Sequence, residues 1–286
     1  MKSLMFLLIL CCSLTTMPAQ VPLSQDEALK QLYHDYDPAK VTAQWVCTKG
    51  QLQSPNKEGW PCRKEDTTVS ISVSLMAKVQ EDKAEKIYLV ASAKPASDPL
   101  GYDCEACAPA IGVAVFTWQK DHWMLQSSNA ATGFYGALGD PPNVDLVTVG
   151  PSKYGLMLSL DNEGQGYASS YMVLLVPVDK TVSDVWSIED EEDDYGAYDP
   201  TDKFAIHVKY RSSAAIKFIG RDDNTDGHYD YYDIEVISRG NDIPDTGTSR
   251  RLKDVNWTEI YRFSNGKYRL LQHKDFLEIK KPSKPH

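Results

Sequence analysis

Short runs of β-branched and aromatic residues recur along the chain from residue 67 onward, and apolar and polar positions alternate within many of them. The clearest run is Thr67–Leu75, TTVSISVSL, in which the apolar residues fall on every second position. Such alternation predicts a strand that buries one face of an antiparallel sheet. Further strands are predicted at 87–93, 111–118, 123–127, 144–149, 154–160, 170–178, 204–210, 215–219, 231–237, 258–263 and 268–272. The chain is therefore predicted to be mainly β, with antiparallel sheets.

Turn signals connect these runs in a loosely repeated order. Lys120-Asp121 and Asn265-Gly266 each separate two strand runs, and Asn-Gly is a strong signal for a two-residue hairpin. A strand, a polar loop, a second strand and a hairpin recur with starts near Ile87, Tyr154 and Ala215. This order favours blade-like, propeller-type units. Chance similarity among short strands is the alternative.

One short helix is predicted near the N-terminus, at residues 24–36. Ser24 can cap it, and Glu27 stands three places later, as in a capping box. Apolar residues then recur at helical spacing until Asp37-Pro38 ends the pattern. We expect this helix to pack on the β body, and a helix that binds a partner is the alternative.

The first nineteen residues have the order of a cleavable secretory signal peptide. Lys2 supplies a positive start, an apolar run covers Leu4–Leu14, and Ala19 precedes the expected cleavage point. The run is shorter than the roughly 20 residues that a membrane-spanning helix needs. Lipid attachment at Cys11 or Cys12 is disfavoured, because no small residue in the usual pattern precedes them. The protein is thus expected to be periplasmic or extracellular, without a transmembrane segment after cleavage.

Acidic residues outnumber basic ones in this chain. There are 40 Asp and Glu against 30 Lys and Arg, which gives a formal net charge of −10. An acidic chain without a basic stripe repels nucleic-acid phosphates, so nucleic-acid binding is excluded as an expectation. Basic partners or divalent cations suit this charge better.

Four cysteines follow the predicted signal peptide: Cys47, Cys62, Cys104 and Cys107. An even number in an exported protein indicates disulfides. Proximity in sequence favours Cys47–Cys62 and Cys104–Cys107, and the other pairings stay open. The C-x-x-C spacing of the second pair is also found in thiol–disulfide oxidoreductases, but the sequence offers no helix behind it to activate a thiolate. A zinc site formed by all four is the remaining alternative.

The residues from Asp222 to Asp233 match the spacing of a calcium-binding loop. When Asp222 is position one, oxygen-bearing side chains stand at positions one, three, five, nine and twelve, and glycine stands at position six. Calcium prefers six to eight hard oxygen ligands, and glycine permits the tight turn that collects them. The candidate ligands are Asp222, Asn224, Asp226, the backbone carbonyl of His228, Asp230 and Asp233. An ordinary Asp/Asn/Gly turn between strands is the alternative.

This stretch, with its flanking strand runs at 215–237, resembles the calcium loop of FG-GAP or integrin-type β-propeller repeats. The resemblance is local. It implies a structural Ca²⁺ that stabilises a blade. The other possible units depart from the pattern, since Asp161-Asn162-Glu163-Gly164 is degenerate and the first unit carries two cysteines instead.

An acidic run, Glu189–Asp194, is predicted to lie in a loop that extends to Pro200. Such a run is a solvated linker or a docking site for a basic partner. The remaining candidates for a functional role are exposed aromatic residues and single histidines. For each of them, packing within a strand or simple exposure at the surface is the alternative. They are Trp118, His122, Trp123, Tyr195, Tyr198, His34, His207 and His273.

These features divide the chain into four segments. They are a signal peptide at 1–19, a helix and disulfide loop at 20–66, a β-rich domain at 67–276 with its acidic loop at 189–200, and a tail at 277–286. The sequence contains no G-x-S-x-G, no H-E-x-x-H, and no S-x-x-K with supporting motifs, so it carries no hydrolytic signature of these classes. We therefore expect an exported, non-catalytic protein that binds a protein or a cell-envelope component, for instance an inhibitor or immunity-type protein. A thiol–disulfide oxidoreductase or an envelope hydrolase is the alternative.

Overall fold

The structure is a computed structural model that describes residues 21–45, 68–96, 108–164, 167–193, 211–220, 231–242 and 253–276. The predictions for the signal peptide, the four cysteines, most of the calcium loop, strand 204–210 and the tail fall on residues outside these ranges.

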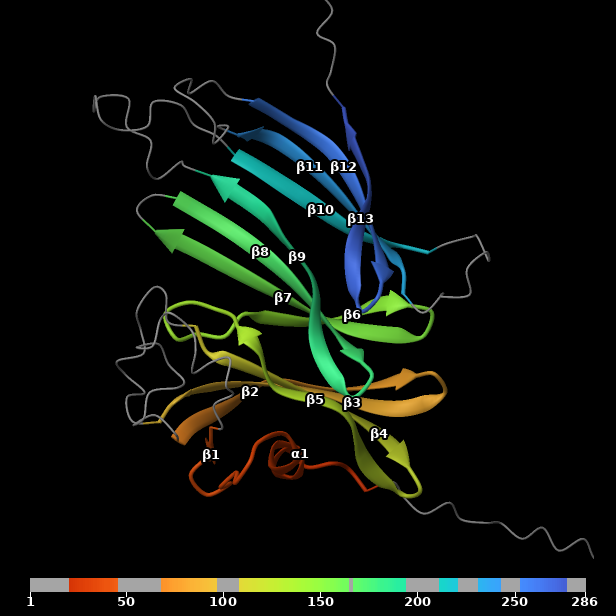
Figure 1. Cartoon of the computed structure of the whole chain (residues 1–286). Coiled ribbons are helices and arrows are strands. Elements are labelled where there is room, and N and C mark those ends of the chain that lie inside the picture. Colours follow the sequence, from red (N-terminus) through yellow and green to blue (C-terminus); the bar gives the residue numbers. More distant parts are fainter. Residues whose placement is uncertain are drawn as a thin grey trace, which may run out of the picture.

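The described residues form one helix and two antiparallel sheets, as predicted (Figure 1). The five-stranded sheet follows helix α1 (Gln25–Leu32) and has the order β1 (Thr42–Gln44), β2 (Thr68–Glu81), β3 (Ala84–Pro95), β4 (Ala110–Gln119) and β5 (His122–Phe134). The eight-stranded sheet contains β6 (Asn143–Gly150), β7 (Lys153–Gly164), β8 (Tyr167–Val178), β9 (Thr181–Asp193), β10 (Arg211–Ile219), β11 (Asp233–Asp242), β12 (Lys253–Ser264) and β13 (Lys267–Asp275). Consecutive strands are neighbours throughout both sheets. This up-and-down order is also that of a propeller blade.

The predicted capping box starts α1. The Ser24 side chain accepts a hydrogen bond from the backbone N–H of Glu27, and the Glu27 carboxylate accepts from the backbone N–H of Ser24 at 3.0 Å. The helix ends at Leu32, four residues before the predicted boundary, because Tyr33 is already extended. The chain beyond it still contributes Tyr33 and Tyr36 to the core.

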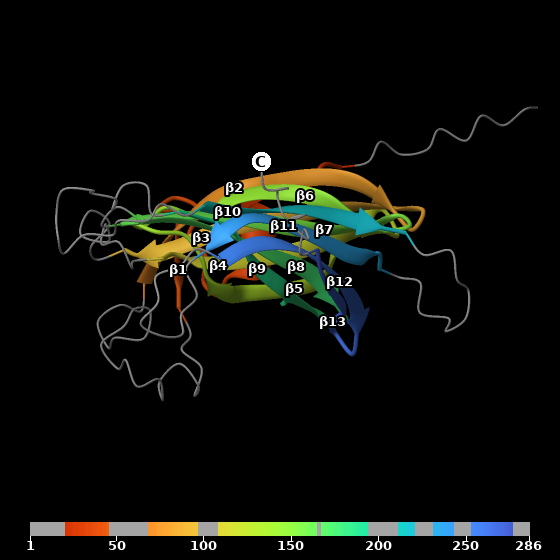
Figure 2. The ribbon, with the colours of Figure 1, turned by 90° about the horizontal axis from the view of Figure 1, so that it is seen from above.

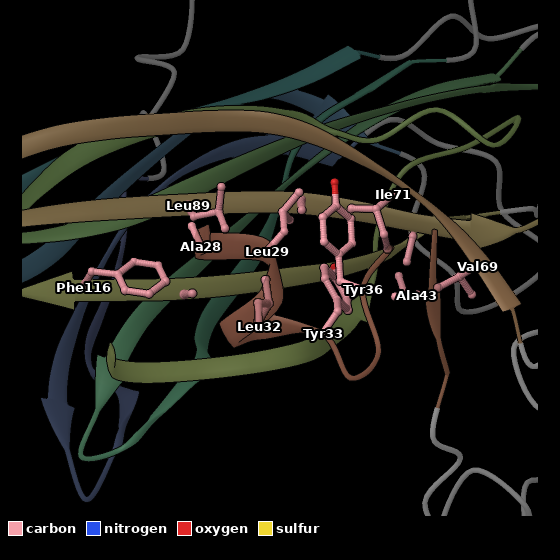
Figure 3. Close-up of a cluster of buried hydrophobic side chains, with 14 of the residues drawn as sticks. Ala28, Leu29, Leu32, Tyr33, Tyr36, Ala43, Val69, Ile71, Leu89 and Phe116 are labelled. Atoms are coloured by element: carbon pink, nitrogen blue, oxygen red, sulfur yellow. The ribbon is translucent and has the colours of Figure 1, made fainter. Parts of the chain in front are cut away.

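Helix α1 covers the outer face of the five-stranded sheet (Figure 3). Leu29 is fully buried there, against a face that includes Leu89 and Phe116. Tyr33 lies over Gly112 of β4, where a Cβ atom would stand 2.2 Å from the phenol oxygen. Glycine at this position therefore allows the segment after α1 to approach the sheet closely.

The inner face of the same sheet packs against the eight-stranded sheet. Strands β3 and β4 are buried on both faces, and their alternate residues serve the two cores. Tyr88, Val90 and Val113 meet Leu158 and Leu175 of the second sheet. Viewed from above, the strands of the two sheets overlie one another (Figure 2).

A third core forms because the eight-stranded sheet curls onto itself. Trp186 and Leu174, from β9 and β8, share one cluster with Ile234, Val236 and Tyr268 from β11 and β13. The rings of Trp186 and Tyr261 meet edge to face with their centroids 5.9 Å apart. The C-terminal strands are thus held by packing as well as by strand pairing.

The predicted hairpin turns are confirmed. Lys120 and Asp121 have φ of 49° and 64°, and Asn265 and Gly266 have φ of 51° and 77°. Positive φ at both turn residues is the geometry that matches the right-handed twist of the flanking strands.

The prediction of a loop for the acidic run is wrong for Glu189–Asp193. These residues form the end of β9 and pair with β8, and Glu191–Asp193 also pair with β10. Asp and Glu are poor strand formers, but pairing on both sides supplies backbone hydrogen bonds that outweigh this weak local preference. Strand β9 was missing from the prediction altogether, because two bulges interrupt its alternation.

Candidate functional site

A groove of about 420 Å³ opens at the margin of the contact between the two sheets. Its floor is apolar and belongs to the core between the sheets, and its rim carries two carboxylates and two phenols. It is lined by Tyr135, Leu160, Tyr171, Val173, Asp184, Ser187, Ile188 and Glu189.

Two bulges in β9 bring these side chains to the groove. Leu174 and Leu175 pair with Trp186 and Asp184, so Val185 is the extra residue of the first bulge. A bulge reverses the inward and outward alternation of the residues that follow it. Asp184 and Ser187 therefore both line the groove although an odd number of positions separates them. The second bulge inserts Asp190 in the same way.

The first carboxylate of the groove is Asp184, which accepts a hydrogen bond from the phenol of Tyr135 at 3.3 Å. Burial raises the pKa of Asp184, and the bond from Tyr135 opposes this effect. Burial, and then the carboxylate, raise the pKa of Tyr135. The phenol therefore stays protonated and donates at neutral pH.

The second carboxylate is Glu189, which stands opposite Tyr171 in the pairing of β8 with β9. A hydrogen bond to Glu189 raises the pKa of Tyr171, and burial adds to this effect. Tyr171 is nevertheless 40% exposed, and Tyr167 on the same strand is 42% exposed. An exposed phenol next to a carboxylate offers both a ring face and a negative charge to a ligand.

Negative charge continues from the groove along the end of β9. Oδ1 of Asp190 is buried and has no hydrogen-bond partner among the described residues. Burial raises the pKa of Asp190, and the charges of Glu191, Asp161 and Glu189 raise it further. Arg211 forms an ion pair with Glu191. The repulsion among these carboxylates is a cost that a cation placed beside them would reduce.

Of the six predicted calcium ligands, only Asp233 falls on a described residue. It is the first residue of β11 and is 4% exposed. Its carboxylate accepts from Arg262, with Nη2 at 2.9 Å from Oδ2 and Nε at 3.2 Å from Oδ1. Among the described residues, no cluster of three or more His, Cys, Asp or Glu side chains could hold a metal ion. Calcium binding therefore stays a prediction about residues outside the described ranges.

The other predicted residues lie apart from the groove. Trp118 and Trp123 form an edge-to-face pair across the β4–β5 hairpin with centroids 5.3 Å apart. His122 contacts the backbone carbonyl of Lys120 at 2.9 Å. His34 contacts Asp35 at 2.8 Å on the surface. Tyr195, Tyr198 and His207 are outside the described residues.

His273 lies between two carboxylates on the outer hairpin. Its Nδ1 is 2.8 Å from Glu259 and its Nε2 is 3.2 Å from Asp275. The hydrogen bond to Glu259, followed by the one to Asp275, raises the pKa of His273. These three side chains lie on β12 and β13, and none of them lines the groove.

Sequence reasoning identified Glu189 as part of an acidic run but missed Tyr135, Tyr171 and Asp184. Tyr171 lies in the predicted strand at 170–178, but the continuous run YMVLLV at 171–176 does not show which face each side chain occupies. Asp184 gave no signal, because its orientation depends on a bulge.

Comparison of the chain with models of known protein families, with curated proteins and with solved structures found no match. In the part of the chain that the structure describes, none of the helical residues form a segment long and apolar enough to cross a membrane.

Proposed function

We propose that this is an exported, non-catalytic binding protein and that its groove receives a basic side chain of a protein partner. One observation carries the proposal. Asp184 and Glu189 stand in the same hollow as the phenols of Tyr135 and Tyr171, with further carboxylates beside them on β9.

A guanidinium or ammonium group suits this combination. Carboxylates form charge-assisted hydrogen bonds with it, and Arg can do so with two bonds at once. A cation over a tyrosine ring gains about 0.5–1 kcal/mol at an exposed site. Burial is the main cause of the raised pKa of Asp190, and repulsion from neighbouring carboxylates adds to it; a cation next to Asp190 would relieve that repulsion.

The charge of the whole chain supports the same kind of partner. A net charge of −10 attracts a basic protein over distances near the Debye length and speeds encounter. One concrete version is an inhibitor or immunity-type protein that faces a basic toxin or hydrolase outside the cytoplasm.

The test uses a hexa-arginine peptide, with hexa-glutamate as the reverse-charge probe. Asp184→Asn/Glu189→Gln removes both groove carboxylates. Asp35→Asn/Glu85→Gln is the matched control. It removes one carboxylate after α1 and one on β3, and its net charge equals that of the groove variant. Calorimetry should show at least tenfold weaker binding for the groove variant, about 1.4 kcal/mol, and little change for the control. Equal weakening in both variants would mean that only overall charge matters, and the groove proposal would fail.

We also propose that the loop containing Asp222, Asn224, Asp226, the His228 carbonyl and Asp230 binds a structural Ca²⁺, with Asp233 at its end. The carboxylate of Asp233 is already held by Arg262, so the loop would depend most on the first five groups. A chelator should lower the melting temperature of the wild type, and Asp226→Ala should remove the difference between chelated and calcium-loaded protein. A melting curve that responds to neither calcium nor chelator contradicts the metal assignment.

A further inference from the structure

A second hollow, of about 350 Å³, lies at the other end of β7, β8 and β9, where hairpins of both sheets meet. The β2–β3 and β8–β9 hairpins contribute to it, together with the start of β7 and the chain around β11 and β12. It is lined by Glu81, Asp82, Lys86, Gln126, Lys153, Tyr154, Pro177, Val178, Asp179, Tyr231 and Phe263. We call it the hairpin pocket.

A buried ion pair forms part of the hairpin pocket. The Lys86 ammonium lies 2.6 Å from Oε1 of Glu81, and the two side chains are 8% and 6% exposed. The Tyr88 phenol, which is fully buried, donates to the other carboxylate oxygen of Glu81 at 2.5 Å. The three side chains hold one positive and one negative charge, so this part of the pocket is neutral overall.

The two charged groups can each form more hydrogen bonds than they form within the protein. An ammonium has three donors, and among the described residues Glu81 is the one group that accepts from Lys86. A carboxylate has about four acceptor positions, and Lys86 and Tyr88 use two of those on Glu81. Buried donors and acceptors without partners are costly. Because both residues line the pocket, a molecule inside it can complete these bonds.

Another part of the pocket lining is aromatic and held in place. The rings of Tyr231 and Phe263 lie with centroids 4.2 Å apart, and Tyr268 supports Phe263 edge to face at 5.3 Å. The phenol of Tyr231 donates to the carbonyl of Pro177 at 3.0 Å, which fixes the ring. Lys153 lies 5.6 Å from the centre of the same ring. The wall is therefore in place before a ligand arrives, and such preorganisation lowers the entropy cost of binding.

We propose that the hairpin pocket binds a neutral saccharide unit. A hydroxyl group can donate to Glu81 and accept from Lys86 at the same time, which matches the unused capacity of this pair. The apolar C–H face of a sugar ring can pack on the aromatic wall formed by Tyr231 and Phe263. A volume of about 350 Å³ lies at the small end of the range for ligand pockets, which suits a ligand of sugar-ring size.

The surrounding charges favour a neutral ligand over a charged one. Asp82 and Asp179 stand with Glu81 around the pocket, while Lys86 and Lys153 carry the opposite charge. Asp82 and Asp179 are exposed, so water screens their charges, whereas the buried pair of Glu81 and Lys86 is neutral overall. A charged sugar would therefore lose its hydration without gaining an unpaired buried charge as a partner. A neutral polyol can hydrogen-bond to groups of either sign without this desolvation cost.

The test is saturation-transfer NMR on the full mature chain with glucose, galactose, mannose and N-acetylglucosamine at millimolar concentration. Glucuronic acid and glucosamine serve as charged comparisons. We expect saturable signals from at least one neutral sugar and at least tenfold weaker binding of the charged sugars. The absence of a saturable signal from every neutral sugar would overturn the proposal, and so would equal or tighter binding of a charged one.

Two variants locate the binding. Phe263→Leu removes part of the aromatic wall, and Phe134→Leu is its control at an exposed position on β5. Glu81→Gln/Lys86→Met removes both buried charges together, so that neither is left unpaired. We expect Phe263→Leu and the double variant to weaken sugar binding at least tenfold, with no change for Phe134→Leu. Equal affinity in all three would overturn the assignment to this pocket. A circular dichroism spectrum like that of the wild type shows that each variant is folded, and hexa-arginine binding, measured separately, distinguishes this proposal from the one for the groove.

Discussion

At the scale of single residues, the buried Glu81–Lys86 pair limits which substitutions the β2–β3 hairpin tolerates. Removing one member of a buried ion pair leaves an uncompensated charge, which costs about 3–5 kcal/mol. We therefore expect Lys86→Met to lower the free energy of unfolding by about 3 kcal/mol in urea denaturation. Glu81→Gln/Lys86→Met keeps an acceptor for Tyr88 and should recover most of this loss. Equal destabilisation of the single and double variants would show that the two charges are not coupled.

Asp190 carries a prediction about pH. Its pKa is raised in the folded state, above the ordinary value of 3.8. The folded protein therefore holds this proton more tightly than the unfolded chain, and stability falls as pH rises through the raised pKa. We expect Asp190→Asn to stabilise the protein at neutral pH by about 0.5 kcal/mol, a typical cost of a like-charge neighbour in a sheet.

The gain from the same variant should shrink as pH falls, because a growing share of the wild-type carboxyl is then protonated. Urea denaturation at pH 4 and pH 7 measures both values. A gain that is as large in acid as at neutral pH would mean that the side chain acts through packing and not through its charge.

At the scale of elements, the docking of α1 depends on the close approach of Tyr33 to β4. A Cβ at Gly112 would stand 2.2 Å from the Tyr33 phenol oxygen, so Gly112→Ala should destabilise the protein by about 1–3 kcal/mol, the usual cost of overpacking. Tyr33→Phe removes the nearest of the atoms in the way, while the ring carbon Cζ at 2.9 Å and the carbonyl oxygen of Ala130 at 3.0 Å remain. The phenol oxygen has no hydrogen-bond partner among the described residues. The double variant should therefore be more stable than Gly112→Ala alone. Additive effects in thermal unfolding would contradict this contact.

Elements with a strong local signal could be predicted from the sequence. Ser24 and Glu27 indicated the start of α1, and Asn265-Gly266 indicated the last hairpin. Strand β9 could not be predicted, because Asp184 and the acidic residues that follow have a low intrinsic strand preference. Its formation depends on pairing with β8 and β10, which a local pattern does not contain.

The candidate groove was less predictable than the fold, for a related reason. Tyr135 follows the last strand of the first sheet, and it reaches Asp184 of the second sheet because the sheets stack. Bulges then decide which residues of β9 point toward it. Contacts between residues that are distant in sequence, and reversals of strand alternation, leave little trace in the sequence itself.

At the scale of the whole molecule, the layers explain why the two hollows lie where they do. Helix α1 covers one face of the five-stranded sheet, and the eight-stranded sheet covers the other and curls to enclose its own C-terminal strands (Figure 1). The contact between the sheets opens at the acidic end of β9 and at the hairpin pocket. The groove collects carboxylates and phenols, whereas the hairpin pocket has a neutral ion pair and an aromatic wall.

The proposal that the groove binds a basic partner is tested by titrating isotope-labelled protein with hexa-arginine and following backbone amide shifts by NMR. We predict saturable shifts concentrated at Tyr135, Tyr171, Asp184, Ser187 and Glu189. Asp35 and Glu85, which are also acidic but lie elsewhere in the fold, should respond little. Shifts of similar size at all acidic positions, without saturation, would show non-specific charge attraction and would contradict the proposal.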